Sequence, residues 1–160
     1  MTLNTPQDYT VEIVGGIRYA IRASGVVCSF TAPATTRGLA KLYTVSRDGA
    51  LVYVGIAQQP MSARLNFGFK ASGKGGYHGY KWKHLTERLA LSVWTAHGEG
   101  ETVGIREMET VEAEVAFLCR LESHQWPAFQ HEIHFNSSSE VHRAAAKTIY
   151  EHAIRTVSPR

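Results

Sequence analysis

A hairpin in the first half of the chain constrains the fold most. Residues 39–46 and 51–55 are short runs rich in β-branched and aromatic residues, which predict strands. The Asp48-Gly49 pair between them is typical of the tight turn that joins antiparallel strands. We therefore expect two adjacent antiparallel strands in this part of the chain.

A helix is predicted directly after this hairpin. Pro60 is typical of a helix start, and Met61, Leu65 and Phe69 recur every four residues, so they share one helical face. That apolar face would pack on the hairpin. Arg64 lies beside the face, free to point at a ligand.

The remaining elements complete an α+β pattern. In chain order they are a hairpin over 9–22, a strand over 26–30, a short helix over 80–88, a strand over 89–96, a helix over 108–121, an extended piece over 129–135 and a last helix over 141–154. Ser137 and Glu140 form the capping box expected before that last helix. The pattern predicts a small central antiparallel sheet, of about three strands plus an N-terminal hairpin, flanked by helices.

The domain organisation expected from this order is simple. Residues 1–160 form a single domain, with 1–40 as an N-terminal β extension, 41–135 as the core and 137–155 as a C-terminal helix. No apolar run reaches the length of a membrane span, and the first ten residues lack the features of a signal peptide. We therefore expect a cytoplasmic protein without a membrane partner.

Charge is distributed unevenly along the chain. Residues 64–88 contain six Lys or Arg against one acid, a net charge of +5, whereas residues 99–122 carry a net charge of −5. Aromatic residues alternate with the cations of the basic block. This combination is typical of nucleic-acid binding, although a solvated surface loop has the same composition.

Two tyrosines, a glycine and an arginine stand at spacings that resemble the GIY-YIG nuclease family. Tyr53 follows Tyr43 by ten residues, and Arg64 follows Tyr53 by eleven. In that family two tripeptides lie on adjacent strands and an arginine follows on the next helix. Leu42-Tyr43 would match the first tripeptide, with Lys41 replacing its glycine, and Tyr53-Val54-Gly55 the second. The resemblance covers roughly residues 41–135 and implies a GIY-YIG-like fold.

The resemblance implies hydrolysis of DNA phosphodiester bonds, in duplex or branched DNA, with one Mg²⁺ or Mn²⁺. Glu114 would hold the metal, and Arg64 would clamp a phosphate with its planar, permanently charged guanidinium. Tyr43 would act as the base or orient the water, and Tyr53 would support the phosphate or the water by hydrogen bonding. Gly55 would let the backbone approach closely.

Two assignments stay open at this point. Glu112 competes with Glu114, because the two lie about 200° apart on a helix and both flank its apolar stripe; the family order favours Glu114. Repair-type members of the family carry a lysine directly after the second tripeptide, where this chain has Ile56. Other members carry a His or Tyr one turn past the arginine, where this chain has Gly68. His78, which can accept a proton near neutral pH, is the best substitute base.

Several residues are expected to bind nucleic acid directly. They lie mostly in the glycine-rich basic loop, and they are Lys70, Lys74, Tyr77, Tyr80, Lys81 and Lys83. Their cations would neutralise backbone phosphates next to the cut. Gln130 stands where the family often has an asparagine, and it keeps an amide on a longer side chain.

Other functions compete with nuclease activity. A domain of this fold without the catalytic groups would be an inactive nucleic-acid-binding module. A zinc hydrolase built on His131 and His134, with His124 and Glu132 nearby, is a third reading, although the spacing is one residue short of the H-E-x-x-H motif. Target specificity would come from residues 1–40, from the basic loop, from a partner or from a homodimer.

Overall fold

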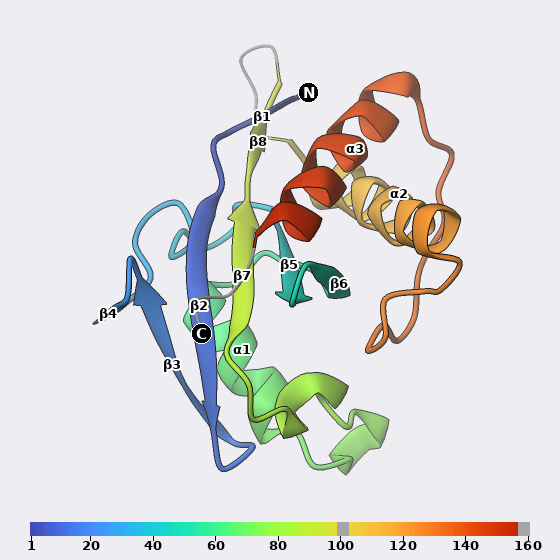
Figure 1. The fold of residues 1–160 in the computed structure, drawn as a ribbon. Coiled ribbons are helices and arrows are strands. Elements are labelled where there is room, and N and C mark those ends of the chain that lie inside the picture. The colour runs from blue at the N-terminus through green and yellow to red at the C-terminus, as the bar shows by residue number, and fades with distance from the viewer. Residues whose placement is uncertain (99–102, 157–160) are drawn as a thin grey trace.

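The computed structural model describes residues 1–98 and 103–156, and a six-stranded antiparallel sheet lies at its centre (Figure 1). The strand order in this sheet is β4-β3-β2-β7-β5-β6, and β1 pairs with β8 in a separate small sheet. The strands are β1 (Thr2–Leu3), β2 (Gln7–Val14), β3 (Arg18–Ala23), β4 (Val26–Cys28), β5 (Lys41–Arg47), β6 (Ala50–Ala57), β7 (Leu89–Trp94) and β8 (Ala96–His97). The helices are α1 (Met61–Lys70), α2 (Ile105–Ser123) and α3 (Glu140–Arg155), with short 3₁₀ turns η1 (Lys74–Gly76) and η2 (Lys81–His84).

The sheet is larger than the sequence predicts. Both predicted hairpins form, β2 with β3 and β5 with β6, and the α+β class is confirmed. However, β2 also pairs with β7, with Tyr9 opposite Leu91 and Val11 opposite Leu89. The N-terminal hairpin is therefore part of the central sheet rather than an extension of it. Alternating apolar residues specify which face of a strand is buried but not which strand lies beside it. The pairing of β2 with β7 therefore could not be predicted from the sequence.

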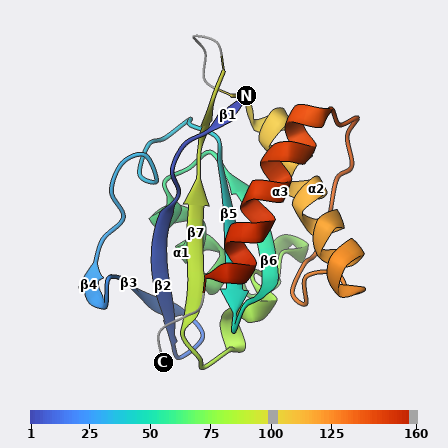
Figure 2. The same ribbon diagram turned by 45° about the horizontal axis from the view of Figure 1, so that its top comes forward.

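Helices cover both faces of the sheet. Figure 2 shows α3 in front of the sheet and α1 behind it. Side chains alternate between the two faces along each strand, so Tyr43 and Tyr53 join the core beneath α1, whereas Leu42 and Val54 join the core beneath α2 and α3. The two phenols of the β5–β6 hairpin are thus directed towards the helix that carries Arg64.

The expected apolar face of α1 is confirmed. Met61, Leu65 and Phe69 are each completely buried, and Pro60 occupies the N-cap position. The helix is thereby fixed against the sheet with Arg64 on a flank that is only half-buried. Within the described ranges no helix is long and apolar enough to cross a membrane.

The β6 edge of the sheet is covered by the segment after α2. The backbone N–H of Phe129 donates to Val52 O at 2.9 Å. The side-chain amide of Gln130 donates to Val54 O at 3.1 Å and accepts from Val54 N at 3.0 Å. A side chain therefore supplies the paired hydrogen bonds that another strand would give, and the unpaired edge is blocked without a further strand.

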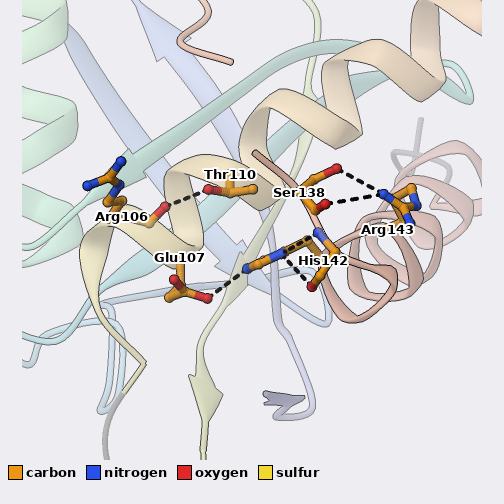
Figure 3. Close-up of polar contacts among 7 residues, drawn as sticks. Arg106, Glu107, Thr110, Ser138, His142 and Arg143 are labelled. Atoms are coloured by element: carbon orange, nitrogen blue, oxygen red, sulfur yellow. Dashed lines mark hydrogen bonds and ion pairs between the residues drawn. The ribbon is translucent and has the colours of Figure 1, made fainter. Parts of the chain in front are cut away.

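The cap of α3 lies two residues later than predicted. Ser139, rather than Ser137, is the N-cap residue, and His142, rather than Glu140, closes the capping box. The Ser139 N–H donates to His142 Nδ1 at 3.0 Å. His142 Nε2 lies 2.7 Å from a Glu107 carboxylate oxygen on α2 (Figure 3). Because Nδ1 accepts a hydrogen bond, Nε2 carries the proton, and neutral His142 both caps α3 and ties it to α2.

Replacing His142 tests this double role. His142→Ala removes the cap contact and the link to Glu107, so we expect the free energy of unfolding in urea to fall by about 1 kcal/mol. Lys147→Ala is the control, because the Lys147 side chain is 72% exposed on the same helix and meets Glu151 only at 3.9 Å. That variant should change the free energy by less than about 0.5 kcal/mol. Equal effects of the two substitutions would contradict the role given to His142.

Candidate active site

A cavity of about 820 Å³ opens beside the edge strand β6. Its walls come from β6, from α1 and the basic loop that follows, from α2 and from the segment that covers the β6 edge. The lining residues with polar or ionisable side chains include Tyr53, Arg64, Tyr77, His78, Tyr80, Lys81, Lys83, His84, Glu112, Gln130, His131 and Glu132. Segments far apart in the sequence therefore meet around one opening.

Arg64 is held by a closed cycle of hydrogen bonds. Its Nε donates to Tyr43 Oη at 3.2 Å, and Tyr43 Oη lies 2.8 Å from Tyr80 Oη. Tyr80 Oη donates to the Arg64 backbone carbonyl at 3.4 Å. Since Arg64 Nε can only donate and Tyr80 gives its proton to the carbonyl, Tyr43 must donate to Tyr80. This Tyr43–Tyr80–Arg64 cycle begins and ends on Arg64 and fixes the orientation of the Arg64 side chain.

Two further contacts orient the guanidinium. Arg64 Nη1 donates to Tyr77 Oη at 3.3 Å, and the Arg64 Cζ atom lies 5.4 Å from the centroid of the Tyr80 ring. The second contact is a cation–π interaction. Within residues 1–98 and 103–156, no carboxylate lies within ion-pair distance of Arg64. The surrounding phenols therefore orient the positive charge without neutralising it.

The buried phenols of Tyr43, Tyr53 and Tyr80 are not bases at neutral pH. Burial raises the pKa of Tyr43 and of Tyr53 well above the usual value of 10, and burial also raises the pKa of Tyr80. Tyr43 is completely buried and does not line the cavity. The Tyr43 hydroxyl is thus a positioning group behind Arg64 instead of a group that contacts a ligand. Tyr53 lines the cavity and remains a neutral hydrogen-bonding group.

Two glycines make room for the aromatic rings. Gly55 lies opposite Tyr43 across the β5–β6 pair, and a Cβ there would lie 2.7 Å from Tyr43 Oη and 2.8 Å from the Tyr53 ring. A Cβ at Gly68 would overlap the ring of Tyr80. Gly68 stands one turn past Arg64, where the GIY-YIG pattern has a His or Tyr, and here the Tyr80 hydroxyl reaches the arginine from the loop. The sequence predicts that Tyr80 binds nucleic acid, whereas the structure buries Tyr80 almost completely and places its hydroxyl against the Arg64 backbone.

The structure places Glu112, and not Glu114, in the lining of the cavity. Glu114 is half-buried elsewhere on α2 because it is rotated by about 200° around the helix axis. Burial and the neighbouring Glu109 raise the pKa of Glu112 from its usual value near 4.5 to about 8. At neutral pH and without a bound cation, this carboxyl group is therefore mostly protonated.

The basic loop contributes unequally to the cavity. Tyr77, His78, Lys81 and Lys83 line it, whereas Lys70 and Lys74 lie exposed outside it. Lys83 Nζ donates to Ala71 O at 2.8 Å and to His78 O at 3.0 Å, so most of its donors hold the loop in place.

The residues after α2 take other roles than expected. The Gln130 amide is engaged on the Val54 backbone, so it is structural although it borders the cavity. His134 lies 3.2 Å from Glu109 and 3.2 Å from Glu132, while His131 lines the cavity. In the part of the chain that the structure describes, no three His, Cys, Asp or Glu side chains are grouped to hold a metal. The predicted zinc arrangement of His131 and His134 is therefore not assembled.

Comparisons of the chain with protein-family models, with curated proteins and with solved structures found no match. The function of the site is therefore argued from its geometry and from the order of its residues.

The contact between Gly68 and Tyr80 can be tested by a double-mutant cycle. Gly68→Ala should lower the free energy of unfolding by about 2 kcal/mol, because the added methyl group displaces the Tyr80 ring. In a Tyr80→Ala background the same substitution should be neutral or stabilise the helix by up to about 1 kcal/mol. Urea unfolding of the four proteins measures both effects. A cost that is the same in both backgrounds would contradict the packing described.

The raised pKa of Glu112 predicts an unusual dependence of stability on pH. Between about 4.5 and about 8 the folded protein holds a proton on Glu112 that the unfolded chain has lost. The free energy of unfolding without divalent cations should therefore fall as the pH rises through this range, with a contribution of up to about 1.4 kcal/mol per pH unit. Glu112→Gln should flatten this dependence, and Glu114→Gln should not. Parallel pH profiles of wild type and Glu112→Gln in chelator would refute the assignment.

Proposed function

We propose that this chain is a metal-dependent endonuclease that hydrolyses DNA phosphodiester bonds, with a GIY-YIG-like arrangement of its site residues. The observation that carries the proposal is the oriented, unneutralised Arg64 in a cavity that also exposes His78 and Glu112. A guanidinium in this state binds phosphate oxygens well, because its charge is permanent and its N–H groups are directional. The cations of the basic loop extend positive charge beyond the cavity, which favours a polyanion.

Arg64 binds the phosphate at the bond to be cut. Nε and Nη1 are engaged with Tyr43 and Tyr77, and the described residues make no hydrogen bond to Nη2. The free N–H groups are available for a phosphate oxygen as negative charge builds up in the transition state. Tyr53, which keeps its proton, donates to a phosphate oxygen or orients the attacking water.

The donor set fits one Mg²⁺ or Mn²⁺ held by Glu112. A single carboxylate with water and phosphate oxygens completing the shell is a usual magnesium site. A nearby divalent cation would favour the charged form of the carboxyl group, which burial alone disfavours. When bound, the metal would neutralise phosphate charge and assist the leaving oxygen.

His78 is the group that accepts the proton of the attacking water. It lines the cavity on the loop that Lys83 holds in place, and histidine accepts protons near neutral pH. Tyr43 keeps its proton and acts by positioning Arg64 and Tyr80. The base assigned here is therefore His78 in preference to Tyr43.

A catalytically inactive DNA-binding domain is the alternative, and one observation favours it. Ile56, at the position of the family's lysine, lines the cavity with an apolar side chain. This leaves the cavity without the cation that repair-type GIY-YIG members carry at this position. Such a domain would bind DNA through Arg64 and the basic loop without cutting it.

Cleavage of plasmid and labelled duplex DNA tests the proposal. Wild type should cut with Mg²⁺ or Mn²⁺ and not with chelator, and Glu112→Gln should cut at least about 100-fold more slowly while still binding DNA. His78→Ala should also lose about 100-fold or more, because it removes the proton acceptor.

Glu114→Gln is the matched control, since it makes the same change on the same helix outside the cavity. It should keep wild-type activity. Cutting that survives Glu112→Gln and disappears in Glu114→Gln would contradict the site. DNA binding without cutting in any metal would establish the inactive alternative.

A further inference from the structure

Phe67 is an exposed aromatic residue with an ordered partner. Its side chain is 58% exposed although it lies on α1, beside the proposed phosphate clamp. The Phe67 ring stacks on Tyr77, with 5.0 Å between centroids and 10° between the ring planes. One side of Phe67 is thus covered by a parallel ring, and much of the remainder is open to solvent. Single exposed apolar residues are common, but an ordered parallel pair next to a cation is a specific arrangement.

This aromatic pair is linked directly to the proposed phosphate site. The hydroxyl of Tyr77, whose ring stacks on Phe67, accepts a hydrogen bond from Arg64 Nη1 at 3.3 Å. Arg64, Phe67 and Lys70 follow one another at intervals of three residues on α1, which makes them neighbours on one ridge of the helix. Lys70 is exposed at the end of that ridge. An oriented cation, an aromatic surface and a second cation therefore succeed one another along the helix.

We propose that Phe67, stacked on Tyr77, is a platform for an unpaired base of the DNA strand whose phosphate binds Arg64. This inference rests on the proposed function and adds a substrate class to it. Bases inside a duplex are already stacked on both sides, so an open aromatic surface can stack only on an unpaired or extruded base and stabilise its binding. Flanking cations neutralise the backbone of such a strand. The preferred substrate is therefore DNA with a single-stranded segment or branch, in preference to a continuous duplex.

Binding to two DNA probes in chelator tests the platform. Fluorescence anisotropy is measured for a single-stranded oligonucleotide and for a blunt duplex of the same sequence, so that no cutting interferes. Phe67→Ala should weaken binding of the single strand at least about fivefold and that of the duplex less than about twofold. Phe67→Trp should keep the affinity for the single strand, because any large ring can stack. Melting curves of the variants check that they are folded.

Phe117→Ala is the matched control. Phe117 is also a partly exposed phenylalanine, at 45%, but it lies on α2, which packs on the other side of the sheet. This substitution should leave both affinities unchanged. In addition, a 2-aminopurine in the single strand should lose fluorescence on binding to wild type and keep it with Phe67→Ala, because stacking quenches the probe.

The possible results separate this inference from the proposed function. If Phe67→Ala weakens neither probe, or weakens both equally, there is no base platform. The proposed function then still stands if Arg64→Ala weakens the binding of both probes. If wild type binds neither probe, the base platform and the proposed function both fail.

Discussion

The site depends on an arginine that is held in place but not neutralised. Arg64 is withdrawn partly from water, and a guanidinium in that position needs hydrogen-bond partners. Its hydrogen-bond partners are the phenols of Tyr43 and Tyr77. Burial raises the pKa of Tyr43 well above its usual value, so this phenol stays protonated and uncharged. Glu112, a carboxyl group that also lines the cavity, is itself mostly protonated at pH 7. A fixed positive charge therefore faces an open cavity, and an anionic ligand is the natural counter-charge.

The strands and helices around the site position Arg64 and its tyrosine partners. Pairing of β5 with β6 places Tyr43 across from Gly55, the residue with no side chain to block its ring. The packing of α1 on the same face brings Arg64 above those strands. Gly68 in the next turn leaves room for Tyr80, which closes the cycle from the loop. On the other side of the β6 edge, α2 supplies the carboxyl group to the same opening.

The sequence predicts the local elements of this fold, but not which strands pair or which side chains face the cavity. The Asp48-Gly49 turn and the four-residue spacing along α1 are local signals, and both elements form as expected. Glu112 and Glu114 both flank the same apolar stripe, so only the packing of α2 shows which one faces the cavity. The side-chain amide of Gln130 can hydrogen-bond to a ligand or to a backbone group equally well. It bonds to the Val54 backbone because β6 is an edge strand, and the sequence does not show which strand lies at the edge of the sheet.

Side-chain ¹⁵N–¹H NMR of Arg64 tests the central claim most directly. If the Tyr43–Tyr80–Arg64 cycle orients a free cation, the Arg64 Nε–H resonance is sharp in the free protein and broadens in Tyr43→Phe. Adding a cleavage-resistant phosphorothioate DNA should then shift the Arg64 guanidinium resonances at the lowest DNA concentrations. Arg64 resonances that stay unchanged while those of other arginines shift would show that DNA binds elsewhere, and would contradict the account.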